Sequence, residues 1–332
     1  TIVLATFIGG MFFGASCAYS LLVKIRVAFP TVNGLFVYAL AEMVIGLCSL
    51  LILFAFPFLQ SDGMGKYLWS ILLLLLPSFF MGVTIPVLYD YAKDKDLARQ
   101  KTLAHLYGNN ALGAATGALA TPYLFFPLFA IDGSLKVGFL LNALLSLSAL
   151  LLWKIEGEGQ CDERENEYEQ SQLDIKINPY FFVFSCGFLS FVAEISIIRL
   201  FTSVLTSATF SFAIVVSSFI VGLSLGGHWA RGRSREQVSV SLLWVCLGSA
   251  FWALIILYAG REMPWLYVWL AGIFSRTAKG WVFFNALQLI TLFLIVSPLS
   301  FCWGAAFCLA AHLFPDGATE KIAKLTAFNT LG

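Results

Sequence analysis

The sequence predicts an all-α polytopic membrane helix bundle, and its composition and the lengths of its apolar runs both support this. Of the 332 residues, 59% are hydrophobic and only 12% are charged. A soluble domain has about 45–50% apolar and about 25% charged residues, so this chain has too little charge to cover a soluble surface. Its apolar residues also gather in runs of about 20, the length that crosses a bilayer as a helix.

The charges and cysteines exclude several other classes of protein. The net charge is +1, so no overall field attracts nucleic acid, and we expect the lipid bilayer as the main partner. Six of the seven cysteines lie inside apolar runs, and no Cys or His pair has the spacing of metal ligands. We therefore expect no metal, no cofactor in this chain, and cysteines that pack as small apolar residues.

Nine apolar runs are long enough to span a membrane, and a tenth begins near residue 325. The expected spans are 2–23, 34–58, 67–89, 106–131, 136–153, 180–203, 207–229, 239–259 and 283–314. Residues 265–274 are too short to span, and their aromatic side chains favour the membrane interface. Because the chain opens and closes inside apolar runs, we expect it to be truncated at both ends.

The loop charges predict the orientation of these spans. Fourteen Lys and Arg residues fall in loops on one side and five on the other, which places the richer side in the cytoplasm, as in a bacterial inner (plasma) membrane. Residues 156–178 hold eight of the 19 acidic residues and are typical of a solvated cytoplasmic linker. This linker separates a first membrane repeat (1–155, lacking its first helix) from a second (179–332, truncated in its fifth helix).

Three short motifs recur in the same order in the two halves and indicate an internal repeat. The pairs are 2–14 with 214–226, 77–82 with 298–304, and 110–113 with 329–332, at offsets of 212 to 222. Each repeat then holds six helices, and an even number keeps the two halves parallel. Parallel repeats of this kind relate the two halves of major-facilitator (MFS) transporters.

Glycine and proline positions predict close contacts and breaks between and within these helices. Small residues four apart let helix backbones approach closely, and a proline removes a backbone donor. The expected packing glycines are Gly10, Gly14, Gly113, Gly117, Gly222 and Gly226. The expected helix breaks are at Pro77, Pro86 and Pro298.

Three charged residues fall inside the expected spans: Glu42, Glu194 and Arg199. Ionisable groups within a membrane are costly and mark functional sites. Glu194 and Arg199 are five residues apart and face different directions on a helix. Glu42 has no acidic counterpart in the second half, which favours either a proton or cation site or a hydrogen-bonded neutral carboxyl; both interpretations stay open.

Asn110 and Asn329 lie at the expected starts of the fourth and tenth spans, where an asparagine can cap a helix or bond between helices. Asn110 is also a candidate substrate contact. No phosphate-binding loop, nucleophile elbow or zinc-binding helix motif occurs in the sequence, so we expect no catalytic residue within it.

Three segments together resemble the membrane portion of the fused major-facilitator/spermidine-synthase family (spermidine-synthase-like integral membrane proteins). They are the stretch from Ser185 through Glu194 to Arg199, the stretch from Phe219 to Gly226, and the set Pro77–Gly82–Pro86 followed by Leu106–Gly117. The resemblance implies a soluble aminopropyltransferase domain, attached or separate, that acts on putrescine. One departure is that Cys308 stands at the repeat counterpart of Pro86.

The functional hypothesis is the membrane domain of a spermidine-synthase-like fusion, which moves, senses or holds a polyamine or other small cationic metabolite. Glu42 and Glu194 are the expected cation contacts. One alternative is a stand-alone MFS-like secondary transporter of another substrate. The other is a non-transporting membrane scaffold for an enzyme or partner.

Overall fold

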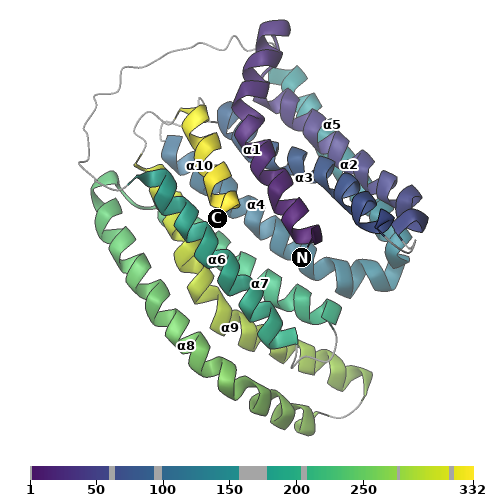
Figure 1. Cartoon of the computed structure of the whole chain (residues 1–332), viewed down its shortest axis with the longest axis vertical. Helices are drawn as coiled ribbons and strands as arrows, with labels where there is room; N and C mark the ends of the chain where they lie inside the picture. The colour runs from purple at the N-terminus through teal and green to yellow at the C-terminus, as the bar shows by residue number, and fades with distance from the viewer. Residues whose placement is uncertain are drawn as a thin grey trace. The chain divides into compact units, whose positions relative to one another are not determined.

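The computed structural model describes residues 2–59, 64–92, 99–156, 178–202, 208–274, 277–313 and 318–332. Within these ranges the chain forms helices and no strand. In chain order (Figure 1) they are α1 Ile2–Ala28, α2 Gly34–Leu59, α3 Gly65–Ala92, α4 Arg99–Ala120, η1 Thr121–Phe125, α5 Phe126–Glu156, α6 Pro179–Thr202, α7 Ala208–Arg231, η2 Arg235–Gln237, α8 Val238–Ile273, α9 Ala278–Ala311 and α10 Thr319–Leu331.

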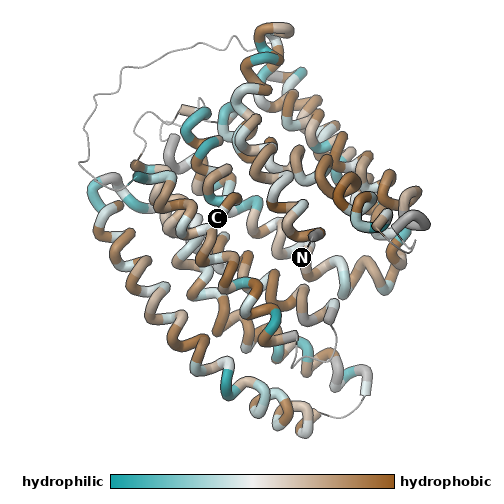
Figure 2. Tube along the Cα trace, in the orientation of Figure 1, coloured by the Kyte–Doolittle hydropathy of each residue, from teal (hydrophilic) through white to brown (hydrophobic). Residues whose placement is uncertain are grey.

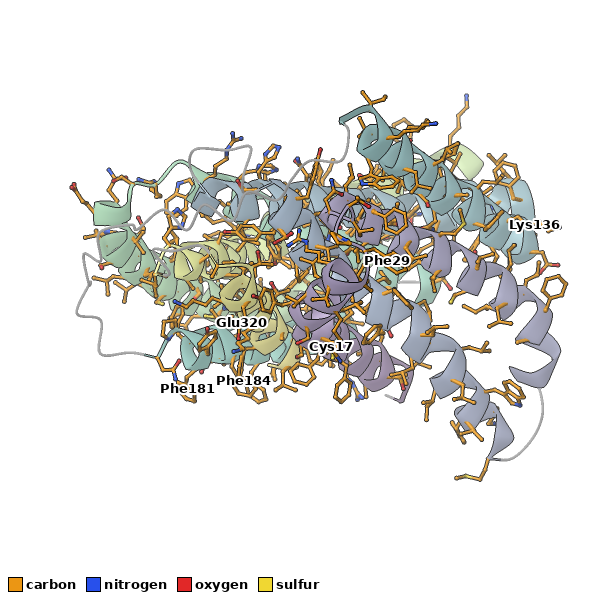
Figure 3. The ribbon with its side chains drawn as sticks, turned by 90° about the horizontal axis from the view of Figure 1, so that it is seen from above. Cys17, Phe29, Lys136, Phe181, Phe184 and Glu320 are labelled. Carbon is orange, nitrogen blue, oxygen red and sulfur yellow. The ribbon has the colours of Figure 1, made fainter. Side chains whose placement is uncertain are left out.

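The helices have the length and composition of a membrane bundle, which confirms the predicted class. Eight helical stretches in the described residues are long and apolar enough to cross a membrane, and one of them, Thr102–Ile155, contains parts of both α4 and α5. Hydrophobic residues dominate along the helices (Figure 2), and Phe181 and Phe184 project outward at the start of α6 (Figure 3). Such outward apolar side chains suit lipid contact. Most of the acidic linker lies outside the described residues.

The helix α8 is longer than the expected span. It continues through Arg261, Glu262 and Pro264 to Ile273, so the expected end at residue 259 is wrong. Charged residues end an apolar run but not a helix, and a single proline removes only one backbone donor. The Trp252 indole donates to the Ile295 carbonyl at 2.7 Å and ties α8 to α9.

The prolines at which a break or kink is expected, Pro77, Pro86 and Pro298, do not end their helices, because α3 and α9 continue through them. Serines next to two of these prolines bond the carbonyls of the preceding turn: Ser78 Oγ donates to the Leu74 carbonyl, and Ser297 Oγ to the Phe293 carbonyl. Neighbouring hydroxyls of this kind are one way in which a membrane helix tolerates proline.

The helix changes form instead at η1, a π-helical turn, and at Ala130 within α5. Pro122 lies in this turn and has no N–H for the usual bond to the residue four before it. The Phe126 N–H instead donates to the Thr121 carbonyl, five residues earlier, and the Thr121 hydroxyl donates to the Gly117 carbonyl at 2.8 Å. Ala130 has a positive φ of 54°, which marks a bend.

The chain forms two compact units, each with its own core. Unit 1 comprises Thr1–Leu106, Phe129–Ser185 and Leu313–Gly332, and unit 2 comprises Tyr107–Leu128 and Cys186–His312. In unit 1, α10 packs against α1 and α3. In unit 2, η1 packs against α7, and the core centres on α6, α7, α8 and α9.

Glycines bring α1 against α3 in unit 1. A Cβ added to Gly10 would overlap the Ser78 side chain, and one added to Gly14 would overlap the Phe79 carbonyl. Gly82 faces the Met11 carbonyl in the same way. The helices therefore touch backbone to backbone, which only residues without a side chain permit.

The same three contacts recur in unit 2 between α7 and α9. Gly222 lies against Ser300, Gly226 against the Phe301 carbonyl, and Gly304 against the Leu223 carbonyl. Every partner is displaced by 212 residues in the first helix and by 222 in the second. The predicted roles of Gly10, Gly14, Gly222 and Gly226 are confirmed. No described atom lies within 4 Å of a Cβ added at Gly113 or Gly117, so their packing role stays a prediction.

The glycine contacts predict opposite effects for one substitution at two neighbouring positions. Gly14→Ala should lower the free energy of unfolding by about 1–3 kcal/mol, because overpacking forces the backbones apart. Gly9→Ala should raise it by about 0.5–1 kcal/mol, because an added Cβ there meets nothing within 4 Å and alanine favours a helix. Unfolding of the purified variants in detergent measures both, and equal effects would contradict the assigned contact.

Candidate functional site

A buried carboxylate joins the ends of three helices in unit 1. Asp90, in the last turn of α3, is 3% exposed. It accepts a 2.5 Å hydrogen bond from the Arg26 guanidinium in the last turn of α1. It also accepts a 2.8 Å bond from the Thr319 hydroxyl, in the first turn of α10. Asp90 therefore holds the start of α10 against the ends of α1 and α3.

The position of Asp90 is electrostatically favourable on two counts. Arg26 neutralises its charge, and the amino end of α10 presents the positive end of a helix dipole. The residue before α10, Ala318, has no side-chain cap, so Thr319 and Asp90 supply polar groups where a cap would otherwise do so. The sequence analysis missed this cluster because the apolar run ended at residue 89. The signal available in the sequence was an acidic residue and a basic residue, Asp90 and Arg26, at the ends of neighbouring helices.

Glu42 is also buried in unit 1, at 8% exposure on α2. Its carboxylate interacts with the Tyr38 hydroxyl, one turn earlier on the same helix. The intervening Ala39 carbonyl accepts a 2.7 Å bond from Ser146 Oγ of α5. This bond ties α2 to α5 close to Glu42. The Glu42 carboxyl is therefore held in place among mainly apolar side chains.

Glu194 and Arg199 are in different environments on α6 in unit 2. Glu194 is half-buried and interacts electrostatically with Tyr107 of α4, whereas Arg199 is exposed. The Tyr107 ring also stacks on Phe307 of α9, with centroids 4.8 Å apart. Glu194 and Tyr107 thus bring the polar groups of two helices together, and Arg199 lies outside that pair.

Packing of α4 against α7 fixes Tyr107. The buried Ser224 hydroxyl of α7 donates to the Gly108 carbonyl at 2.7 Å. The His228 ring lies against Gly108, where an added Cβ would come within 2.9 Å of Nε2. The glycine next to Tyr107 therefore allows α4 to approach α7 closely. This packing sets the position of Tyr107 on α4.

Asn110 does not cap a helix, so that expectation is wrong. The helix α4 begins at Arg99, and Asn110 is exposed well inside it. Asn329 likewise lies near the end of α10, which begins at Thr319. Both helices extend through polar residues before their apolar parts begin, and hydropathy marks only the apolar parts. Asn110 remains a candidate contact on an exposed helical face.

Within the described ranges, no three His, Cys, Asp or Glu side chains come together as metal ligands. The six cysteines in those ranges are free thiols, and Cys161 lies outside them. Comparisons with protein-family models, curated proteins and solved structures gave no match. The roles of Glu42, Asp90 and Glu194 therefore have to follow from the residues around each of them.

Two ion pairs in the described part of unit 1 predict a contrast in stability. Asp90→Asn should lower the free energy of unfolding by about 1–3 kcal/mol, because it leaves the partly buried Arg26 without a counter-charge. Glu320→Gln removes the exposed pair with Lys324, also at 2.5 Å, and should change stability little. Denaturant unfolding of both variants measures the difference. Equal losses would show that burial of Asp90 does not determine its contribution.

Proposed function

We propose that this chain is the membrane domain of a two-repeat transporter-like protein that binds a small cationic metabolite and moves it across the membrane. A polyamine such as putrescine is the proposed cargo, and the fused major-facilitator/spermidine-synthase family is the proposed relationship. The proposal concerns the helical domain alone.

The recurring glycine contacts are the observation that carries the proposal. The contact of Gly14 with Phe79, between α1 and α3, matches the contact of Gly226 with Phe301, between α7 and α9. Packing of α2 on α3 also has a counterpart in packing of α8 on α9. Matching contacts, with one offset for each helix of the pair, support two copies of one helical unit. Many secondary transporters are built in this way.

The acidic residues support a cationic cargo. Glu42 and Glu194 each lie beside a tyrosine, Tyr38 and Tyr107, in surroundings that are otherwise mainly apolar. Carboxylates in such surroundings bind cations strongly, because little water competes for them.

Amine binding tests the role of the two carboxylates. Purified protein should melt at a higher temperature in the presence of putrescine, because a ligand that binds only the folded state stabilises it. Glu194→Gln and Glu42→Gln should each weaken putrescine binding at least about tenfold, a change of about 1.4 kcal/mol in binding free energy. Both variants keep the size and shape of the side chain and remove its charge, with one carboxylate oxygen replaced by an NH2 donor.

The matched control is Glu320→Gln, which removes a carboxylate from the exposed face of α10. It should leave the putrescine-induced shift unchanged. Wild-type protein that gains no stability from putrescine, spermidine or other diamines would refute the cationic cargo. Normal binding by both buried variants would refute the assignment of the carboxylates.

A further inference from the structure

The turn between α7 and α8 in unit 2 carries three arginines next to a tryptophan. Both helices are long and apolar enough to cross a membrane, and the turn joins Arg231, at the end of α7, to Val238, at the start of α8. The Arg233 guanidinium lies over the Trp229 ring, with its central carbon 4.1 Å from the ring centroid. Arg231 is exposed, and Arg235 follows in η2. Positive charge therefore gathers where two expected membrane spans meet.

The contact between α7 and α9 holds the Trp229 ring in place. Gly226, one turn before Trp229, brings α7 against the Phe301 carbonyl. The Phe301 ring packs on the Trp229 ring, with centroids 5.7 Å apart. The Arg233 N–H donates to the Ala230 carbonyl at 3.1 Å and closes the turn. Arg233 is therefore held both by its backbone and by an aromatic ring that is itself packed.

The guanidinium of Arg233 keeps its hydrogen-bond donors for an anion. An indole ring has no lone pair to offer, so contact with it leaves the five N–H donors of the guanidinium to other partners. Among the described residues, no carboxylate forms an ion pair with Arg233. Glu236 is the one acidic residue from 228 to 240 in the sequence, so the turn has a positive net charge. Phosphate oxygens match the paired N–H groups of arginine.

An apolar strip on α8 begins directly after this turn. Its side chains recur every three or four residues, which places them on one face of the helix. They are all between 54% and 68% exposed: Val240, Leu243, Trp244, Leu247, Phe251 and Leu254. The strip is about 21 Å long, which exceeds half of a bilayer core of about 30 Å. Because α8 packs against α9 and lies at the edge of unit 2 (Figure 1), this face suits contact with lipid.

Unit 1 has no equivalent of the stacked arginine. At the offset of 212 residues, Cys17 and Leu21 stand in place of Trp229 and Arg233. The helix α1 also continues through both positions to Ala28. The packing that the two units share therefore does not require the stack. Retention of a loop on one side of the membrane does not require it either, because that effect depends on charge and not on a held side chain.

We propose that the α7–α8 turn, with Arg233 held on Trp229, binds the headgroup of an anionic phospholipid, and that the apolar strip on α8 takes one of its acyl chains. The headgroup phosphate accepts bonds from the guanidinium, and the neighbouring arginines attract the net negative charge. A lipid is favoured over free phosphate because only a lipid also covers the strip. The site concerns the lipid around the protein and not its cargo, so this proposal and the proposed function can fail independently.

Titration of the purified full chain with dioleoylphosphatidylglycerol, followed by native mass spectrometry, tests the site. Dioleoylphosphatidylcholine has the same chains without net charge and should bind at least about fivefold more weakly. Arg233→Ala should weaken phosphatidylglycerol binding about fivefold, the effect of one arginine near a membrane surface. Inorganic phosphate in excess should not displace the lipid.

Two variants that keep the charge of the turn separate a built site from simple attraction. Trp229→Leu should weaken phosphatidylglycerol binding about two- to fivefold, because Arg233 loses the ring that holds it. Arg233→Lys should weaken it about twofold, because an ammonium lacks the paired donors of a guanidinium. The second substitution is at the surface, so it tests the site even where Trp229→Leu lowers the melting temperature.

Arg261→Ala is the matched control. It removes an exposed arginine from a distant part of α8, where Arg261 lies 3.8 Å from Glu262, and should leave phosphatidylglycerol binding unchanged. A loss equal to that of Arg233→Ala would overturn the assignment to the α7–α8 turn.

The remaining outcomes test the held arginine and its occupant. Wild-type affinity in both Trp229→Leu and Arg233→Lys, with weak binding in Arg233→Ala, would show attraction by charge alone and overturn the built site. Equal binding of the two lipids, or displacement of phosphatidylglycerol by inorganic phosphate, would overturn an anionic phospholipid as the occupant.

Discussion

Contact between helix backbones is the constraint on which this structure depends. A membrane gives helices no hydrophobic reason to associate, so close van der Waals packing and hydrogen bonds must hold them together. Gly14 and Gly82 let α1 touch α3, and Gly226 and Gly304 let α7 touch α9. Once these pairs are fixed, α2 and α8 pack against α3 and α9, and each unit acquires its own core.

Polar groups then determine how further segments join each unit. Asp90 holds the start of α10 through Thr319, and Ser224 holds α4 against α7 through the Gly108 carbonyl. Hydrogen bonds of this kind are directional, so they select one arrangement among the many that apolar packing allows. Tyr38 and Tyr107 interact with Glu42 and Glu194, the proposed cation contacts.

The sequence predicts the features that depend on length, apolarity and local spacing. The apolar runs located the helices, and Gly10–Gly14 and Gly222–Gly226 were identified as packing pairs because they recur at one offset. The spacing of Gly113 and Gly117 is the same, yet no described atom lies within 4 Å of a Cβ added there, because spacing alone does not determine which face meets a neighbour. Asp90 and the bond of Ser224 to the Gly108 carbonyl were missed because each joins residues far apart in the chain. Such contacts follow from the tertiary arrangement, and the sequence indicates at most the residue types that take part in them.

Uptake of labelled putrescine by liposomes that contain the full chain tests the central claim most directly. The account predicts saturable uptake above that of protein-free liposomes, with competition by unlabelled diamines. Uptake equal to that of protein-free liposomes, in preparations that bind putrescine, would contradict transport. The domain would then hold the amine at the membrane without moving it.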